Sequence, residues 1–392
     1  MVSKEYPASG EIYHAELPNG LHIYVDRRPE FQKSYAFFAT NYGGMDMKFR
    51  LDGQWRDTPA GVAHFLEHKM FDTEDGNVLQ DLAANGASPN AFTSSALTGY
   101  YFESTEKFCD NLKILLSFVS IPWFTQESVD KEQGIIGQEI GMIEDDPDWK
   151  VFMNLMAALY QHHPIRVSVA GSVESISHIT ADTLYACHKA FYDPPIWCCA
   201  WQGTWTRRRS AAAGRDPAGS GLEHRLPGGT TAPRSPRRCA SMISGRWSLG
   251  PPVPAGIQGG GGPGGRGGPA QQLLGELACE ALLGNSGPLY ARLYREGLVN
   301  RNFSYGYESY PGCAFLCAGG RARTRRECGR RWPPRRSGSH GRGSTPSCGS
   351  AEKSSYGNRV RALNSFEHIC ISQAQSFSRA AISCASRRCT TA

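Results

Sequence analysis

The sequence predicts a fold of strands and helices, because strand patterns open the chain and helix patterns follow them. The segment EIYHAELPNGLHIYVD alternates apolar and polar residues around Pro18-Asn19-Gly20, as a β-hairpin does. The apolar segment SYAFFATNYG predicts a buried strand. Three later segments repeat their apolar residues at helical spacing: KFCDNLKILLSFVS, ESVDKEQGIIGQEIGMI and ITADTLYACHKAFY, the last with Thr180 as its cap.

The formal charge of +6 averages two unlike pieces. Residues 1–195 carry 14 Lys and Arg against 27 Asp and Glu, whereas the remaining 197 residues carry 28 against 9. Eleven of the 13 cysteines also lie in the second piece. A basic, cysteine-rich half is typical of nucleic-acid binding or of a disulfide framework. The Arg- and Gly-rich runs lack the interleaved aromatic residues that stack on bases, so we expect no nucleic-acid partner.

The chain changes character after Pro194. Residues 211–270 contain 16 Gly and 9 Pro, and 22 Arg but no Lys occur between Lys189 and Lys353. Such a composition does not bury enough apolar surface to fold. It fits either a genuine disordered linker or a gene read out of frame. Regrouping the codons of PIWCCAWQGTWT by one base yields an apolar strand ending in a turn, so we favour frameshifts.

The normal balance of residues returns in part later in the chain. We therefore expect a second domain that is disrupted, as the composition of its flanks indicates. The predicted divisions are an N-terminal domain at 1–200, an off-frame or disordered segment at 201–270, a fragment of a second domain at 271–320, and a largely off-frame end at 321–392 with a short regular piece near 353–368.

Two patterns that would place the chain at a membrane are missing from the sequence. No run approaches 18 consecutive apolar residues, and the start, MVSKEYPASGEIYHAELPNG, is polar rather than the apolar stretch of a signal peptide. The expected compartment is the cytoplasm, with no membrane partner.

The segment GVAHFLEHKMF carries the chemistry of the first half. On a helix, His64 and His68 stand one turn apart on the same face, so both imidazoles reach one metal ion. Glu67 lies on the neighbouring edge, where a carboxylate takes a proton from an attacking water. The order His-x-x-Glu-His is the inverzincin arrangement, with zinc as the expected metal.

A zinc site of this kind needs a third ligand from elsewhere in the chain. Glu132 and Glu139 are seven residues apart in VDKEQGIIGQEIGMIEDD, hence two turns apart on one helix face. Such a pair suits one metal ligand and one carboxylate that holds a ligand in place. The spacing itself leaves open which glutamate has which role, and two solvated glutamates on an exposed face fit the pattern as well.

The chain resembles the pitrilysin–insulinase family of zinc peptidases, and is most similar to its short bacterial, processing-peptidase-like members. The resemblance rests on LPNGLHIYV, TPAGVAHFLEHKMF, NGASPNAFTSSALTGYYFES, VDKEQGIIGQEIGMIEDDPDW and HPIRVSVAGSVESISHIT, which cover most of residues 10–194. It implies an α+β fold of two related domains, each a mostly antiparallel sheet covered on one face by helices, with residues 1–200 as the zinc-binding peptidase domain. It also implies a zinc-dependent endopeptidase with one Zn²⁺ per chain, acting on peptides or short unfolded segments.

The resemblance assigns roles to residues of this sequence. His64, His68 and Glu139 would bind zinc, Glu67 would be the general base, and Glu132 the supporting carboxylate. The 71-residue interval from His68 to Glu139 agrees with the family's spacing.

The segment SPNAFTS matches the edge strand on which the family lays its substrate, at Asn90, Ala91 and Phe92. Phe92 is equally suited to a place in the core. In SGPLYARLYREGLVN, Arg295 matches an arginine that helps to hold substrate, but Asn300 stands at or near the position of an expected tyrosine. Short members often work as dimers, so a second copy or a non-catalytic relative is the expected partner.

Two other functions compete with this interpretation. A carbon–sulfur lyase also uses His-x-x-Glu-His, but with a cysteine as the third ligand. A degenerate, frameshifted product would keep the zinc domain without a working second domain, and would act at most as a binding subunit. Other metal candidates, namely His162-His163, Cys198-Cys199 and the pair Cys313 and Cys317, are expected to have no metal role.

Overall fold

The computed structural model supports an α+β fold and divides the chain into two compact units. The first comprises Met1–Gly141, Val167–Gly229 and Ala362–Ala385, and the second comprises Met142–Arg166, Thr230–Arg361 and Ser386–Ala392. The structure describes residues 2–6, 10–194, 197–203, 239–241, 255–259, 269–285, 287–310, 312–320 and 347–376.

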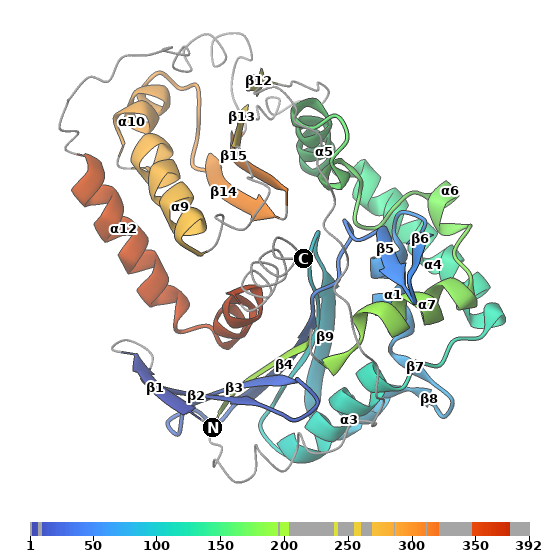
Figure 1. Ribbon diagram of the computed structural model, residues 1–392. Helices are drawn as coiled ribbons and strands as arrows, with labels where there is room; N and C mark the ends of the chain where they lie inside the picture. The colour runs from blue at the N-terminus through green and yellow to red at the C-terminus, as the bar shows by residue number, and fades with distance from the viewer. Residues whose placement is uncertain are drawn as a thin grey trace. The chain divides into compact units, whose positions relative to one another are not determined.

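The first unit is built on a seven-stranded sheet with the order β1-β2-β3-β11-β4-β10-β9 (Figure 1). Only β11 and β3 run parallel among the pairs of this sheet, and the rest are antiparallel. The strands are β1 (Val2–Tyr6), β2 (Gly10–Glu16), β3 (His22–Arg27), β4 (Ser34–Thr40), β9 (Ala87–Thr93), β10 (Thr98–Ser104) and β11 (Trp197–Gly203).

The predicted hairpin and buried strand are confirmed. β2 and β3 pair antiparallel across the Pro-Asn-Gly turn, where Gly20 has a φ of 85° and the Asn19 side chain accepts a hydrogen bond from the Leu21 amide. A positive φ of this size favours glycine, because it has no Cβ to clash with the backbone. Every residue of β4 is buried, as expected for a strand covered on both faces.

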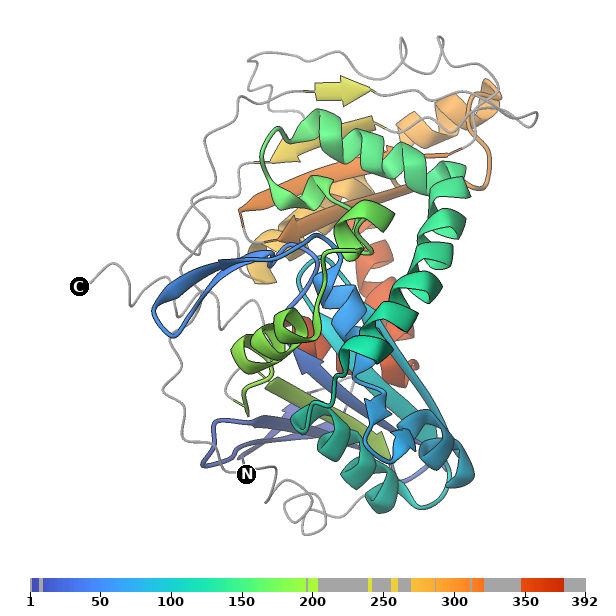
Figure 2. The ribbon, with the colours of Figure 1, turned by 90° about the vertical axis from the view of Figure 1, so that its right-hand side faces the viewer.

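Helices cover one face of the sheet (Figures 1 and 2). Phe38 of β4 and Tyr100 of β10 point to this face, and Phe118 packs edge-on against Tyr100 with ring centroids 5.7 Å apart. All three are buried. The helices of the first unit are α1 (Val62–Lys69), α2 (Val78–Ala84), α3 (Phe108–Ser120), α4 (Gln126–Asp145, whose last residues belong to the second unit), α6 (Val173–Ile176) and α7 (Ala181–Phe191).

The three predicted helices are α3, α4 and α7, and Thr180 caps α7 by accepting a hydrogen bond from the Thr183 amide, as expected. Two short antiparallel hairpins complete the unit: β5 (Lys48–Leu51) with β6 (Gln54–Asp57), and β7 (Asp72–Thr73) with β8 (Gly76–Asn77).

The opposite face of the same sheet is covered by a segment from the end of the chain, which the sequence did not predict. Helical residues 366–376 place Cys370 and Ala374 against Tyr35, Phe37 and neighbouring side chains. Successive residues of a strand point to opposite faces, so Phe37 and Phe38 serve the two different cores. The sheet of this unit is therefore packed on both faces rather than on one.

The second unit contains a four-stranded antiparallel sheet with the order β12-β13-β15-β14. Within this unit the Tyr160 hydroxyl donates a hydrogen bond of 2.9 Å to the Ala314 carbonyl. Its elements are α5 (Pro147–Leu159), the 3₁₀ turn η1 (Pro164–Arg166), β12 (Cys239–Ser241), β13 (Ala255–Gly259), α9 (Pro269–Leu283), α10 (Pro288–Arg295), β14 (Ser304–Tyr310), β15 (Cys313–Gly319) and α12 (Ser347–Ala362).

The helix-then-strand pattern predicted for 271–320 is confirmed by α9, α10, β14 and β15. By contrast, the sequence predicted no regular structure in 211–270, and the structure has the short strands β12 and β13 there. Main-chain hydrogen bonds to a neighbouring strand do not depend on side-chain type, which lets a Gly-rich segment extend a sheet. β11 likewise lies where the regrouped codons predicted a strand, although the frameshift itself stays a prediction.

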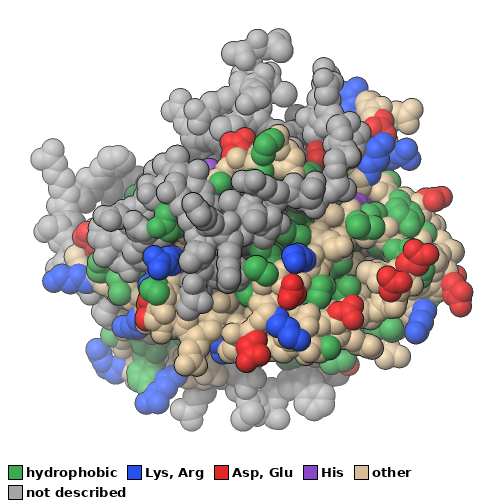
Figure 3. Space-filling model, turned by 90° about the horizontal axis from the view of Figure 1, so that it is seen from below, with side chains coloured by type: hydrophobic (Ala, Val, Ile, Leu, Met, Phe, Trp, Pro, Cys, Tyr) green, Lys and Arg blue, Asp and Glu red, His purple; other side chains and the backbone are tan. Residues whose placement is uncertain are grey.

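None of the helices in the described parts of the chain has the length and apolar character needed to cross a bilayer. On the face shown in Figure 3, basic and acidic side chains are interspersed over the described surface rather than gathered by sign.

Candidate metal centre

The first half of the site is the helix α1, whose start is held by tight backbone contacts. Gly61 precedes the helix with a φ of 94°, and a Cβ at this position would lie 2.6 Å from the Ala170 carbonyl oxygen. The Ser175 hydroxyl donates a hydrogen bond of 2.8 Å to the Ala60 carbonyl. Contacts with Ala170 and with Ser175 of α6 therefore fix where α1 begins, and only glycine fits at position 61.

Burial of one side of α1 determines where its histidines point. Phe65 and Leu66 are fully buried, so His64 and His68 share the less buried side of the helix. Their rings lie 4.7 Å apart, as the i, i+4 spacing predicts.

The second half of the site is α4. Val129, Ile136 and Ile140 are buried and orient this helix so that Glu132 and Glu139 reach α1. Glu139 lies between the two histidines: its Oε1 is 3.4 Å from Nε2 of His64, and its Oε2 is 3.4 Å from Nε2 of His68. The structure thus brings Glu139 next to His64 and His68, although 71 positions separate His68 from Glu139 in the sequence.

The donor set and its spacing fit zinc. One ligand atom from each of His64, His68 and Glu139 lies within 4.8 Å of the other two. A tetrahedral ion bound at about 2.0–2.1 Å holds its ligand atoms about 3.3 Å apart, and each of the two Glu139 oxygens lies 3.4 Å from one imidazole nitrogen. Two imidazoles and one carboxylate are also a ligand set of catalytic zinc, which leaves one coordination position for water.

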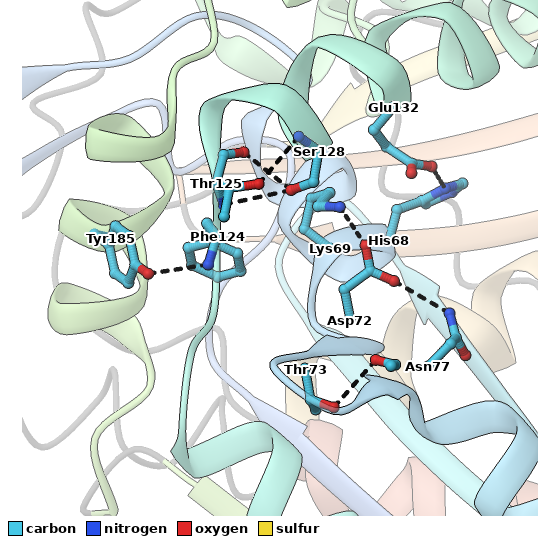
Figure 4. Close-up of polar contacts among 11 residues, drawn as sticks. His68, Lys69, Asp72, Thr73, Asn77, Phe124, Thr125, Ser128, Glu132 and Tyr185 are labelled. Atoms are coloured by element: carbon cyan, nitrogen blue, oxygen red, sulfur yellow. Dashed lines mark hydrogen bonds and ion pairs between the residues drawn. The ribbon is translucent and has the colours of Figure 1, made fainter.

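Glu132 holds His68 in the orientation that a metal requires. Its Oε1 lies 3.0 Å from Nδ1 of His68 (Figure 4). An ionised carboxylate only accepts hydrogen bonds, so this bond places the ring N–H on Nδ1 and leaves Nε2 free to bind metal. His64 differs, since its buried Nδ1 has no hydrogen-bond partner in the described parts of the chain.

The electrostatics of the cluster favour a cation. Burial, followed by the neighbouring His68, lowers the pKa of His64, and Glu139 only partly opposes this. Burial by itself would lower the pKa of His68, but the hydrogen bond to Glu132 and the charges of nearby carboxylates raise it above its usual value. Three carboxylates around two imidazoles therefore attract positive charge, which a proton or a metal ion supplies.

Glu67 lies next to this cluster on the same helix and is largely buried, with 8% of its surface exposed. Burial raises its pKa, while a hydrogen bond from Thr93 and the nearby His68 act in the opposite direction. The Thr93 hydroxyl donates that bond to Oε2 of Glu67 over 2.5 Å. The contact of Thr93 with Glu67 is not predictable from the sequence, since nothing in the spacing of residues 67 and 93 indicates it.

A buried cation also lies beside the site. Lys69 is only 1% exposed and forms an ion pair with Asp72, which accepts a further hydrogen bond of 3.2 Å from the Asn77 side chain (Figure 4). A buried ammonium group needs such a partner, because removing it from water without one is costly. This pair anchors the end of α1.

The expected substrate residues Asn90, Ala91 and Phe92 lie on β9, which is the last strand in the order of its sheet. The Asn90 side chain accepts a hydrogen bond of 2.9 Å from the Ala91 amide. Phe92 is partly buried and stacks on Phe37 with ring centroids 6.0 Å apart. Phe92 therefore packs on the same face of the sheet as Phe37, which is one of the two roles expected for it.

Arg295, the residue expected to bind substrate from the second half, lies in the second unit. Arg295 ends α10 with an exposed side chain, and Asn300 is also exposed. Phe303 packs beside the buried Leu293, and the Tyr305 hydroxyl donates a hydrogen bond to Glu280. Arg295 stays a predicted substrate residue.

The residues set aside as metal candidates do not join the metal centre in the described structure. The His163 ring accepts a hydrogen bond from the Ile165 amide at the start of η1, a capping role. Cys313 and Cys317 are free thiols on β15, and burial raises the pKa of both. The side chains of Cys198 and Cys199 lie outside the described structure.

Comparison with known proteins places this site in a family. Residues 53–173 match the model of the insulinase family, peptidase family M16. The chain is 49% identical over 185 residues to the uncharacterized zinc protease YmfH of Bacillus subtilis, covering 47% of this chain and 43% of YmfH. It thus spans less than half the length of that relative.

Solved structures extend the match over nearly all of the chain. An M16-like peptidase described from Alicyclobacillus acidocaldarius is 30% identical, with a TM-score of 0.82 over 96% of this chain and 90% of that one. A protease from Helicobacter pylori shares the fold at 14% identity, with a TM-score of 0.70 over 94% of this chain and 89% of that one. From these matches, the chain belongs to the insulinase (M16) family of zinc proteases.

Proposed function

We propose that this chain is a zinc-dependent endopeptidase. The observation that carries the proposal is the convergence of His64, His68 and Glu139, with two separations of 3.4 Å that suit a tetrahedral ion. Glu67 lies beside them on the same helix, where a general base is required. Membership of a family of zinc proteases supports the same function.

Each residue of the site has a distinct task in this proposal. His64, His68 and Glu139 would hold zinc, which supplies a water of lowered pKa and polarises the scissile carbonyl. Glu67 takes a proton from the attacking water and later donates it to the leaving amine. Glu132 keeps the His68 ring in the tautomer that presents Nε2 to the ion.

We further propose that the peptide substrate adds to β9 as an extra strand. Asn90 and Ala91 lie on this terminal strand of the sheet, and main-chain pairing would accept many sequences. Such binding suits peptides and short unfolded segments, which can adopt an extended conformation. We also propose Arg295 as a substrate residue.

Two alternatives, a carbon–sulfur lyase and a degenerate product, differ from the endopeptidase in the third metal ligand and in the second half of the chain. A carbon–sulfur lyase would have a cysteine near the two histidines, whereas the carboxylate of Glu139 lies there. A degenerate product that binds zinc without catalysis stays the second candidate, because the composition after Pro194 favours frameshifts.

The test is cleavage of a quenched fluorescent peptide by the zinc-loaded chain. We expect cleavage that a chelator abolishes, and loss of cleavage with retained zinc in Glu67→Gln. The matched control is Glu74→Gln, which removes the same charge from an exposed loop position. Zinc binding without cleavage would support the degenerate product, and cleavage that survives Glu67→Gln would exclude the proposed mechanism.

A cytoplasmic location and a dimer, either of two copies or with a non-catalytic relative, complete the proposal. Gel filtration tests the dimer, since activity that elutes only with the monomer would contradict it.

A further inference from the structure

We propose that Thr93 is a positioning residue for Glu67, so that the strand on which a substrate would lie also orients the general base. This inference rests on the proposed function and deepens it. The family resemblance assigned roles to three residues of β9, at positions 90–92, and none to Thr93.

The geometry ties the last residue of β9 directly to the base. The Thr93 hydroxyl donates a hydrogen bond of 2.5 Å to Oε2 of Glu67. Thr98 also lies near Thr93, with the two hydroxyl oxygens 3.4 Å apart, but Thr98 donates its only proton to the Tyr42 carbonyl over 2.8 Å. The single proton of Thr93 is therefore directed to Glu67.

The support behind Thr93 is rigid. Its main chain pairs with Thr98 in β10, and Thr98 is fully buried. β10 in turn pairs along its whole length with β4, whose residues are all buried. A hydroxyl fixed in this way holds its partner more precisely than a group on a free loop does.

A carboxylate needs this support because its last torsion angle is only weakly restrained. The bond from Thr93 occupies Oε2, so Oε1 of Glu67 is the oxygen that remains to take the proton of an attacking water. Without the bond, the carboxylate group rotates and presents either oxygen in varied directions. A displacement of a catalytic group by about 1 Å costs on the order of a hundredfold in rate.

The arrangement also links substrate binding to catalysis. Asn90 and Ala91, on which the substrate strand would pair, are two or three residues before Thr93 on the same strand. Because β9 is fixed in the sheet, a peptide paired on it and the carboxylate bonded to Thr93 have a fixed spacing. The distance between the scissile bond and Glu67 is thereby maintained for substrates of different sequence.

The experiment compares Thr93→Val, which removes the hydroxyl at nearly constant shape, with Thr93→Ser, which retains it. Thr105→Val is the matched control, since Thr105 is exposed in the turn after β10. We expect Thr93→Val to lower kcat by roughly 10- to 100-fold with KM little changed. Thr93→Ser should recover most of the lost rate, and Thr105→Val should behave as the wild type.

Two further measurements separate positioning from other roles. Thr93→Val should bind as much zinc as the wild type. Adding Thr93→Val to the Glu67→Gln variant should leave that variant's affinity for an uncleaved peptide unchanged.

Each other outcome overturns the inference. A full kcat in Thr93→Val, with Glu67→Gln inactive, would leave the proposed function intact and remove the role of Thr93. A rise in KM alone would make Thr93 a substrate contact, and a loss of zinc or failure of Thr93→Ser to recover activity would make it structural. A zinc-loaded wild type that does not cleave would reject the proposed function, and the inference with it.

Discussion

Removal of the Glu132 carboxylate tests whether the second glutamate of α4 supports the metal centre. In Glu132→Ala, the hydrogen bond of 3.0 Å to Nδ1 of His68 is lost, while the three proposed ligands are unchanged. The His68 ring is then free to rotate and to carry its proton on Nε2. We therefore expect weaker zinc binding without loss of the fold.

The size of the effect follows from the bond and its exposure. A hydrogen bond to a charged group contributes about 1.5–3 kcal/mol, and a supporting carboxylate contributes about 10- to 100-fold in metal affinity. The side chains of His68 and Glu132 are 26% and 15% exposed, so water weakens the bond in part. We expect a loss of roughly 10- to 30-fold, in the lower half of that range. Glu132→Gln keeps an acceptor and should lose less.

The assay is competition for zinc with a chromophoric chelator at alkaline pH, where protons compete little for the histidines. Glu127→Ala on the same helix is the control, because Glu127 is exposed. An unchanged zinc affinity in Glu132→Ala would refute the reasoning. An equal loss in Glu127→Ala would show that the general charge of α4 matters rather than this hydrogen bond.

Three other predictions concern stability. Gly61→Ala should lower the free energy of unfolding, measured by urea denaturation, by about 1–3 kcal/mol more than Gly53→Ala does. Both glycines have a positive φ, but only at Gly61 would the new Cβ meet backbone, 2.6 Å from Ala170, and equal losses of stability would contradict this reason. Burial lowers the pKa of His188 from 6.5 to about 4, so the unfolded chain binds this proton first and stability falls by about 3 kcal/mol as the pH drops from about 6.5 to about 4. Denaturation of His188→Gln should lack this part of the pH dependence, and an identical pH profile would exclude the effect. Zinc at one hundred times its dissociation constant should stabilise the wild type by about 2.7 kcal/mol, seen as a higher Tm, and the same addition should not stabilise His68→Ala.

Much of the local structure could be predicted from the sequence, because it follows from backbone periodicity. The hairpin around Asn19, the buried strand β4 and the helices α3, α4 and α7 appear where apolar spacing and capping residues indicate them. The strands within 211–270 could not be predicted in this way. There, β13 pairs with β15, which is distant in the sequence.

The metal centre shows the same division at the level of single residues. The sequence by itself determined that His64 and His68 share a helix face, and that Glu132 and Glu139 share another, because i, i+4 and i, i+7 spacings follow from helix geometry. Spacing left open which glutamate reaches which imidazole, and the structure places Glu139 between both rings with Glu132 behind His68.

Only the tertiary structure decided the contacts between segments that are distant along the chain. The hydrogen bond from Thr93 to Glu67 and the packing of residues 366–376 on the sheet leave no mark in local sequence patterns. The physical reason is that periodicity sets the direction of a side chain relative to its own backbone. The partner that it meets depends on how the buried faces of separate helices and strands fit together.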